Sequence, residues 1–99
     1  DLSAYSISVL NGSGISGEAA SLRTQLEDAE FVVDSVGNAD TSDYTRTEVF
    51  AKEGVSEAYL NTLIKELEKT YEVNSVTETL DESESVDVEI IIGSTRADN

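Results

Sequence analysis

Three glycines lie in a short turn with the spacing of a phosphate-binding loop. The stretch 11–17 reads NGSGISG and contains Gly-x-Gly-x-x-Gly between an alternating apolar run and a helical pattern. In dinucleotide-binding folds, such glycines let the backbone approach a pyrophosphate at the amino end of a helix, and an acidic residue about 20 positions later binds the ribose. Asp34 stands near that position. The chemistry that this spacing suggests is nucleotide binding.

The charge and the size of the chain oppose a phosphate ligand. Six basic and 21 acidic residues give a net charge of −15, and the turn holds no Lys or Arg. A field of this sign repels phosphates, nucleic acid and anionic lipid, so neither nucleic acid nor direct membrane contact is expected. We therefore interpret Asn11, Gly12, Gly14 and Gly17 as a structural turn or a candidate loop for another ligand. We expect the Asn11 side chain to close this turn by hydrogen bonding.

Few residues of the chain suit catalysis. There is no His and no Cys, so the commonest general base and the strongest nucleophile at neutral pH are missing, and the three arginines are scattered. The acidic segments 34–43 and 81–87 lack the spacing of an EF-hand loop. We expect no catalytic residue, no cofactor and no metal site, with a weak Ca²⁺ site in an acidic loop as the alternative.

Hydrophobic periodicity predicts the elements that hold the turn. Alternating apolar residues predict strands, and apolar residues at helical spacing predict helices that begin after the N-caps Ser16 and Ser56. The last strand is apolar on both faces at its end, which predicts a place inside the sheet. The predicted strands are 5–10, 31–36, 45–50, 71–79 and 86–92, and the predicted helices are 17–29 and 56–69.

The order of these elements predicts one α/β domain of the α+β type. We expect a split β-α-β-β-α-β, ferredoxin-like sandwich with two helices on one face of a mainly antiparallel sheet and an extra edge strand near 71–79. The second and third strands can form a hairpin with a long connection, which is not the crossover that a dinucleotide fold needs. The domain is expected to span 5–93, between a linker remnant at 1–4 and a flexible tail at 94–99.

Three segments stand out by their order and spacing: ISVLNGSGISGEAASLRTQLEDAEFVV (7–33), YTRTEV (44–49) and DVEIIIG (87–93). They resemble, in turn, the signature, the Thr-x-Val strand and the closing strand of the LytR C-terminal domain (LytR_C), a small α/β module of LytR-CpsA-Psr cell-envelope proteins. The likeness covers about residues 5–94. One position departs: the family usually has Gly before the Phe of the second strand, where this chain has Glu30. A non-Gly residue at a left-handed helix end costs about 1 kcal/mol, unless the helix ends differently.

The resemblance implies a location and an accessory role. The parent proteins are membrane-anchored and transfer lipid-linked glycopolymers onto peptidoglycan outside the cell, in an arginine-lined pyrophosphate pocket that three scattered arginines cannot build. It implies a non-catalytic, extracytoplasmic domain, held at the cell surface by an upstream anchor, that binds peptidoglycan or wall glycopolymer or positions the catalytic domain. The alternative is a protein–protein interaction or structural module without glycan affinity. The implied partner is cell-wall glycan or an envelope protein.

Overall fold

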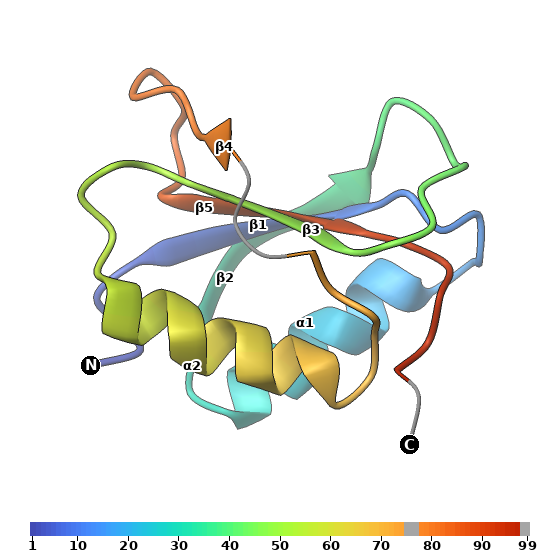
Figure 1. The fold of residues 1–99 in the computed structure, drawn as a ribbon, viewed down its shortest axis with the longest axis horizontal. Helices are drawn as coiled ribbons and strands as arrows, with labels where there is room; N and C mark the ends of the chain where they lie inside the picture. Colours follow the sequence, from blue (N-terminus) through green and yellow to red (C-terminus); the bar gives the residue numbers. More distant parts are fainter. Residues whose placement is uncertain (75–77, 98–99) are drawn as a thin grey trace.

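The computed structural model describes residues 1–74 and 78–97. Within these residues, two helices pack on a five-stranded sheet (Figure 1). The predicted α+β class is confirmed. In chain order the elements are β1 (Ser6–Asn11), α1 (Glu18–Asp28), β2 (Val32–Asn38), β3 (Glu48–Ala51), α2 (Glu57–Glu68), β4 (Glu78–Thr79) and β5 (Val88–Ile92).

The sheet is mostly parallel, with the strand order β2-β1-β5-β3-β4. β1 pairs in parallel with both β2 and β5, and β3 pairs in parallel with β4. Among the described strands, only β3 and β5 are antiparallel neighbours. The predicted mainly antiparallel, ferredoxin-like pairing is therefore wrong. The predicted hairpin is also wrong, because β1 and β5 lie between β2 and β3.

The connections account for this topology. α1 carries the chain back to the amino edge of the sheet, so β2 runs in the same direction as β1. The connection 39–47 is too long for a tight turn, and it crosses the carboxyl edge of β1 and β5 before β3 begins beside Ile91. β5 lies inside the sheet, as its apolar faces predict, and Ile90 and Ile92 are fully buried.

A short strand closes the far edge of the sheet. The predicted edge strand 71–79 is confirmed only in part, since β4 contains two residues, beside Phe50 and Ala51 of β3. Residues 75–77 of that prediction lie outside the described residues. Before them, Val73 forms an isolated parallel bridge with Thr47.

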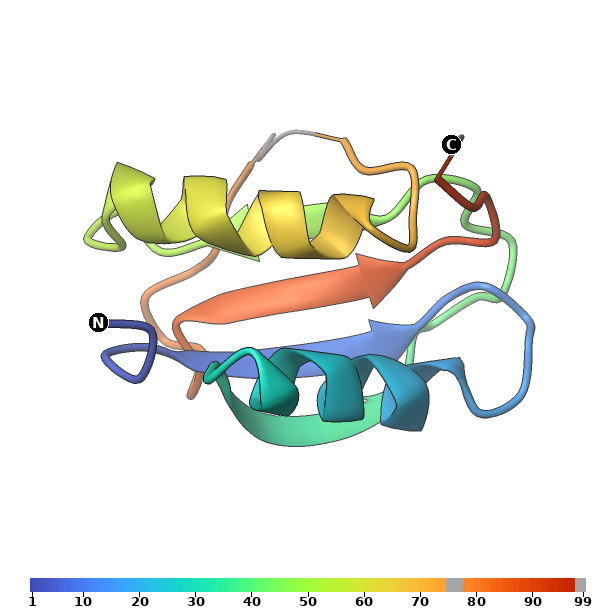
Figure 2. The same ribbon diagram turned by 90° about the horizontal axis from the view of Figure 1, so that it is seen from below.

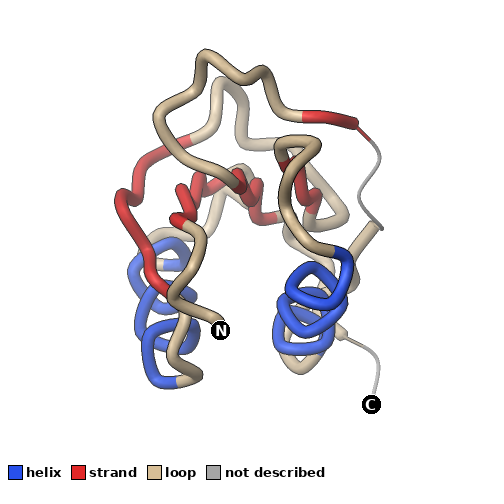
Figure 3. The backbone as a smooth tube through the Cα atoms, turned by 90° about the vertical axis from the view of Figure 1, so that its left-hand side faces the viewer, coloured by secondary structure: helices blue, strands red, loops and turns tan. Residues whose placement is uncertain are grey.

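Both helices lie on the same face of the sheet (Figure 2), which confirms the predicted helical layer. Figure 3 shows the two helices side by side below the strands. Within the described residues, neither helix has the length and apolar character needed to cross a membrane. Fully buried side chains from both layers form the core, among them Ile7, Val9, Leu22, Leu26, Val49, Leu63, Leu67, Val88, Ile90 and Ile92.

The two helices begin differently. The Ser56 side chain accepts a hydrogen bond from the Tyr59 N–H at 3.2 Å, so the predicted cap of α2 is confirmed. The predicted cap of α1 by Ser16 is wrong, because the N-cap is Gly17 in the left-handed conformation (φ 86°) without a side-chain hydrogen bond. The turn therefore places Ser16 one residue outside the helix cap.

The end of α1 has the conformation that usually requires glycine. Glu30 has a φ of 77°, and its N–H donates to the Glu27 carbonyl at 3.0 Å. The Phe31 N–H donates to the Leu26 carbonyl at 3.0 Å, and both of these side chains are buried. These bonds form a Schellman motif, so the helix has the ending that usually takes glycine although the residue is Glu.

Residues 94–97, which the sequence predicts as part of a flexible tail, form hydrogen bonds with other segments of the chain. The N–H groups of Ser94 and Thr95 donate to the carbonyls of Tyr44 and Thr45, at 3.0 and 2.8 Å. Arg96 forms an ion pair with Glu18 of α1 at 2.9 Å. Residues 98 and 99 lie outside the described residues, and at the other end of the chain Leu2 packs against the core.

Candidate functional site

The turn between β1 and α1 is held by its own side chains. The Ser13 N–H and hydroxyl donate to Asn11 Oδ1, at 3.0 and 2.7 Å. Asn11 Nδ2 donates to the Ile15 carbonyl at 2.8 Å, and the Ile15 N–H donates to the Ser13 hydroxyl at 3.0 Å. Asn11 thus closes the turn in the way the sequence suggested. Its side chain keeps limited hydrogen-bonding capacity for a ligand.

Two glycines of the turn have specific structural roles. Gly12 is buried under Tyr44, and a Cβ atom at Gly12 would lie 2.6 Å from Tyr44 Cδ1. Gly17 meets no atom within 4 Å of such a Cβ, but its left-handed backbone favours glycine. The glycine pattern therefore serves close packing at one end of the turn and the entry into α1 at the other.

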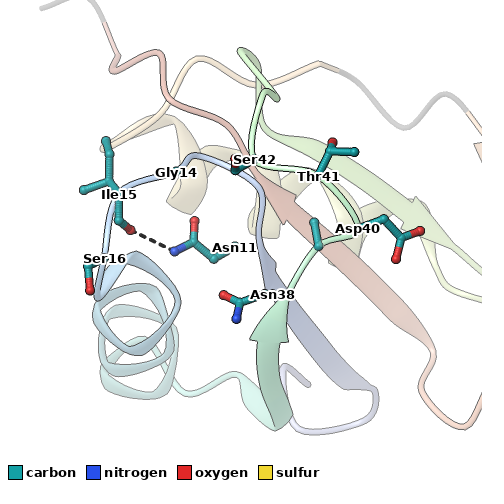
Figure 4. A pocket seen from close by; sticks show the side chains of 9 residues that line it. Asn11, Gly14, Ile15, Ser16, Asn38, Asp40, Thr41 and Ser42 are labelled. Atoms are coloured by element: carbon teal, nitrogen blue, oxygen red, sulfur yellow. Dashed lines mark hydrogen bonds between the residues drawn. The ribbon is translucent and has the colours of Figure 1, made fainter.

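A pocket of about 380 Å³ lies beside this turn, at the carboxyl ends of β1 and β2 (Figure 4). One wall is the turn, and the other wall is the start of the connection 39–47. Ligands of open parallel sheets commonly bind at this edge, and the volume suits a small ligand. The lining residues are Asn11, Gly14, Ile15, Ser16, Asn38, Ala39, Asp40, Thr41 and Ser42.

Asn38 carries the amide that is available in this pocket. Asn11 and Asn38 are the last residues of β1 and β2, and they are direct partners in the parallel register. The Asn38 side chain is exposed and makes no hydrogen bond to any described residue, unlike that of Asn11. In Figure 4, the Asp40 carboxylate points away from both amides. The Asn38 amide can therefore donate and accept towards a ligand.

The surroundings do not favour a phosphate ligand. One feature does fit a dinucleotide site. The hairpin expected after the second strand is absent, and β1, α1 and β2 form the parallel crossover that such sites use. However, none of the described residues that line the pocket is Lys or Arg. Asp34 is an exposed extra residue in β2, where the register shifts, and it does not line the pocket. The acidic residue that would bind the ribose of a dinucleotide therefore lies outside the pocket.

The acidic segments do not gather into a metal site. Among the described residues, no three carboxylates are close enough together to hold an ion. The Asp81 carboxylate accepts a hydrogen bond from the Ser83 N–H at 2.9 Å, which lowers its pKa. Thr41 donates to Asp43 at 2.7 Å in the other segment. These carboxylates are used in closing their own loops.

The shifted ionisable groups serve structure. Burial raises the pKa of Tyr59 to about 12, and burial together with Glu18 raises that of Tyr71. The Tyr71 hydroxyl donates to the buried Glu18 at 2.9 Å, and the Arg96 guanidinium lies 5.2 Å from the Tyr71 ring centre. This cluster, which was not predicted from the sequence, ties the first turn of α1 to the last described residues. A lone buried Glu at a helix start has no signature in the sequence.

One wall of the pocket was predictable from the sequence, and the other was not. Asn11 and Gly14 line the pocket, whereas Gly12 lies buried behind the turn and Gly17 lies at the helix cap. The second wall, 38–42, lies in the acidic segment 34–43, which the sequence suggested only as a weak Ca²⁺ loop. Its place beside the turn depends on the parallel pairing of β1 with β2, which the sequence analysis did not predict.

Comparisons with known proteins agree with this architecture. The family model LytR_C, described as "LytR cell envelope-related transcriptional attenuator", matches residues 4–95. A crystal structure of the soluble domain of a conserved hypothetical secreted protein from Mycobacterium marinum is similar, with a TM-score of 0.60 and 22% identity. The similarity covers 99% of this chain, which spans 66% of that one. No curated protein sequence matches the chain.

Proposed function

The chain belongs to the LytR_C family, and on that premise we propose that it is a non-catalytic, extracytoplasmic accessory domain that binds neutral wall glycan. The observation that carries the proposal is the pocket between the turn and the connection 39–47, lined by amides and hydroxyls. An anchor outside this chain would hold the domain at the cell surface. The domain would thereby keep a neighbouring catalytic domain close to the wall.

The pocket chemistry fits a neutral sugar better than an anionic polymer. A sugar hydroxyl both donates and accepts hydrogen bonds, as do the Asn38 amide and the Ser16 and Ser42 hydroxyls that line the pocket. The net charge of −15 repels the phosphates and carboxylates of anionic wall polymers. The preferred ligand is therefore the glycan strand of peptidoglycan. An anionic polymer attached to that strand would hinder the domain from reaching it.

Two binding measurements test this function. Purified wall sacculi, before and after removal of the anionic polymer, are incubated with the domain and sedimented. We expect retention at moderate salt that increases when the polymer is removed. Titration with a tetramer of N-acetylglucosamine should then shift the amide resonances of Asn11, Asn38 and Thr41 in the NMR spectrum.

Asn38→Ala is the critical variant, and Asn61→Ala is its matched control. Asn38 lines the pocket, whereas Asn61 is an exposed residue of α2 on the other layer. Loss of the Asn38 hydrogen bonds should weaken tetramer binding about fivefold, and Asn61→Ala should leave it unchanged. Absence of retention on both kinds of sacculi, or equal effects of the two variants, would contradict glycan binding at this pocket.

A further inference from the structure

The sheet has one face that neither helix of the described residues covers. β2, β1 and β5 form a parallel ribbon, and parallel sheets are normally covered by helices on both faces. Here α1 and α2 both lie on one face (Figure 3). The connections 39–47 and 80–87 rise beside the other face (Figure 1). We call this surface the open face and define it by Ser8, Leu10, Glu48, Phe50, Glu89 and Ile91.

The strand register places these residues in two rows across the sheet. In one row, Phe50 pairs with Glu89, and Glu89 with Ser8; in the other, Glu48 pairs with Ile91, and Ile91 with Leu10. Leu10 and Phe50 are partly exposed, Ile91 is buried, and none of the three apolar side chains belongs to the core beneath the helices. The open face therefore carries three apolar side chains, and Glu89 lies between Phe50 and Ser8 in the first row.

Carboxylates lie among and beside these apolar side chains. Glu48 and Glu89 lie on the open face, Asp40 lies in the connection 39–47, and Glu84 lies in the connection 80–87. Burial and then the charges of Glu84 and Asp40 raise the pKa of Glu89, so the two loops bring negative charge towards the open face. None of these four carboxylates forms an ion pair with a described residue. The ammonium of Lys52 instead donates to the Glu84 carbonyl oxygen at 2.6 Å.

We infer that the open face is the docking site for a basic amphipathic helix of a partner protein. A helix supplies the layer that a parallel sheet lacks, its apolar stripe covers Leu10 and Phe50 beside the buried Ile91, and its Lys or Arg side chains meet the carboxylates. A second copy of this chain does not fit, because its own net charge of −15 would oppose the contact. This surface adjoins the glycan pocket at Asp40, which lines the pocket, but the inference does not depend on the proposed function.

A designed peptide tests the inference directly. The probe is an 18-residue Ala-based helix with Leu along one stripe and Lys on its flanks; the comparison peptide has Glu in place of Lys. We expect the Lys peptide to bind at low salt, to weaken at least fivefold at 300 mM NaCl, and to shift the resonances of Ser8, Leu10 and Phe50. The Glu peptide should not bind. Shifts confined to α1 and α2, or binding of both peptides alike, would overturn the inference.

Charge-matched variants separate a local site from the general acidity of the chain. Glu48→Gln/Glu89→Gln removes two charges from the open face, and Asp28→Asn/Glu68→Gln removes two from exposed positions of the helices. The first pair should weaken the Lys peptide about fivefold and the second less than twofold. Phe50→Ser should weaken it as well, with the circular dichroism spectrum as a check of folding. Equal losses for the two charge pairs would show non-specific attraction and overturn the site.

Discussion

Glu30 bears a side chain in a backbone conformation that favours glycine. Its φ of 77° is the left-handed C′ position of the Schellman motif that ends α1. A Cβ atom there costs about 1 to 2 kcal/mol, and glycine loses part of that advantage through the entropy of the unfolded chain. Glu30→Gly should therefore raise the free energy of unfolding by about 1 kcal/mol, measured by urea denaturation.

The control for Glu30→Gly must remove the charge and keep the Cβ atom. Glu30→Ala does so. It keeps the Cβ atom and removes the carboxylate, which lies at the negative end of the helix dipole. We expect Glu30→Ala to gain less stability than Glu30→Gly. Equal gains would mean that the charge, not the backbone, limits this helix end.

Packing, not the backbone angle, is the reason why position 12 requires glycine. A Cβ atom would lie 2.6 Å from Tyr44 Cδ1 and 3.0 Å from Ile91 Cγ2, so Gly12→Ala must displace Tyr44. We expect a loss of about 1 to 3 kcal/mol in chemical denaturation. Gly54→Ala is the matched control, since no atom lies within 4 Å of its Cβ position. In a double-mutant cycle, Tyr44→Ala should recover much of the loss; additive effects would contradict steric conflict with Tyr44.

At the scale of elements, the starts of the two helices provide a comparison within one chain. Ser56 caps α2 through the Tyr59 N–H, whereas Ser16 precedes the Gly17 cap of α1 without a capping bond. Ser56→Ala should lower the free energy of unfolding by about 1 kcal/mol, and Ser16→Ala by less than about 0.5 kcal/mol. Thermal and urea unfolding of both variants measure this. A larger effect at Ser16 would contradict the observed cap of α1.

The extents of the helices were predictable, and the neighbours of the strands were not. Helical spacing located α1 and α2 to within one residue at each end, because Leu22, Leu26, Leu63 and Leu67 mark a single buried face. Alternation shows which strand residues are buried, but it does not show which strands pair. The parallel pairing of β1 with β2 depends on how α1 packs, and the connection 39–47 gave no sign that it crosses the sheet edge. For this reason the Asn11 side of the pocket was found and the Asn38 side was not.

On the scale of the whole molecule, the connection 39–47 links the two candidate surfaces. Thr41 and Ser42 of this connection line the pocket, and the charge of Asp40 contributes to the raised pKa of Glu89 on the open face. The net charge of −15 acts on both surfaces. It favours a neutral ligand in the pocket and a basic partner on the open face, so one composition sets two different selectivities.

The same charge makes folding stability depend on pH through Glu89. Its pKa is raised in the folded protein, first by burial and then by Glu84 and Asp40, so the folded state binds the proton more tightly than the unfolded chain. The stability contributed by this group is fully present below the unfolded pKa and is lost as pH rises through the folded pKa. Glu89→Gln should therefore stabilise the protein at pH 7 and change little at pH 4.

Salt separates the two causes of this shift. Screening at 500 mM NaCl weakens the repulsion from Glu84 and Asp40 but leaves the cost of burying the carboxylate. The gain from Glu89→Gln at pH 7 should therefore shrink with salt and remain above zero, while Glu68→Gln, at an exposed position of α2, should give a smaller gain at low salt. Urea denaturation at pH 4 and pH 7, each at low salt and at 500 mM NaCl, measures the free energy of unfolding under all four conditions. A gain that persists unchanged at pH 4 would show that Glu89 acts through packing and not through its charge.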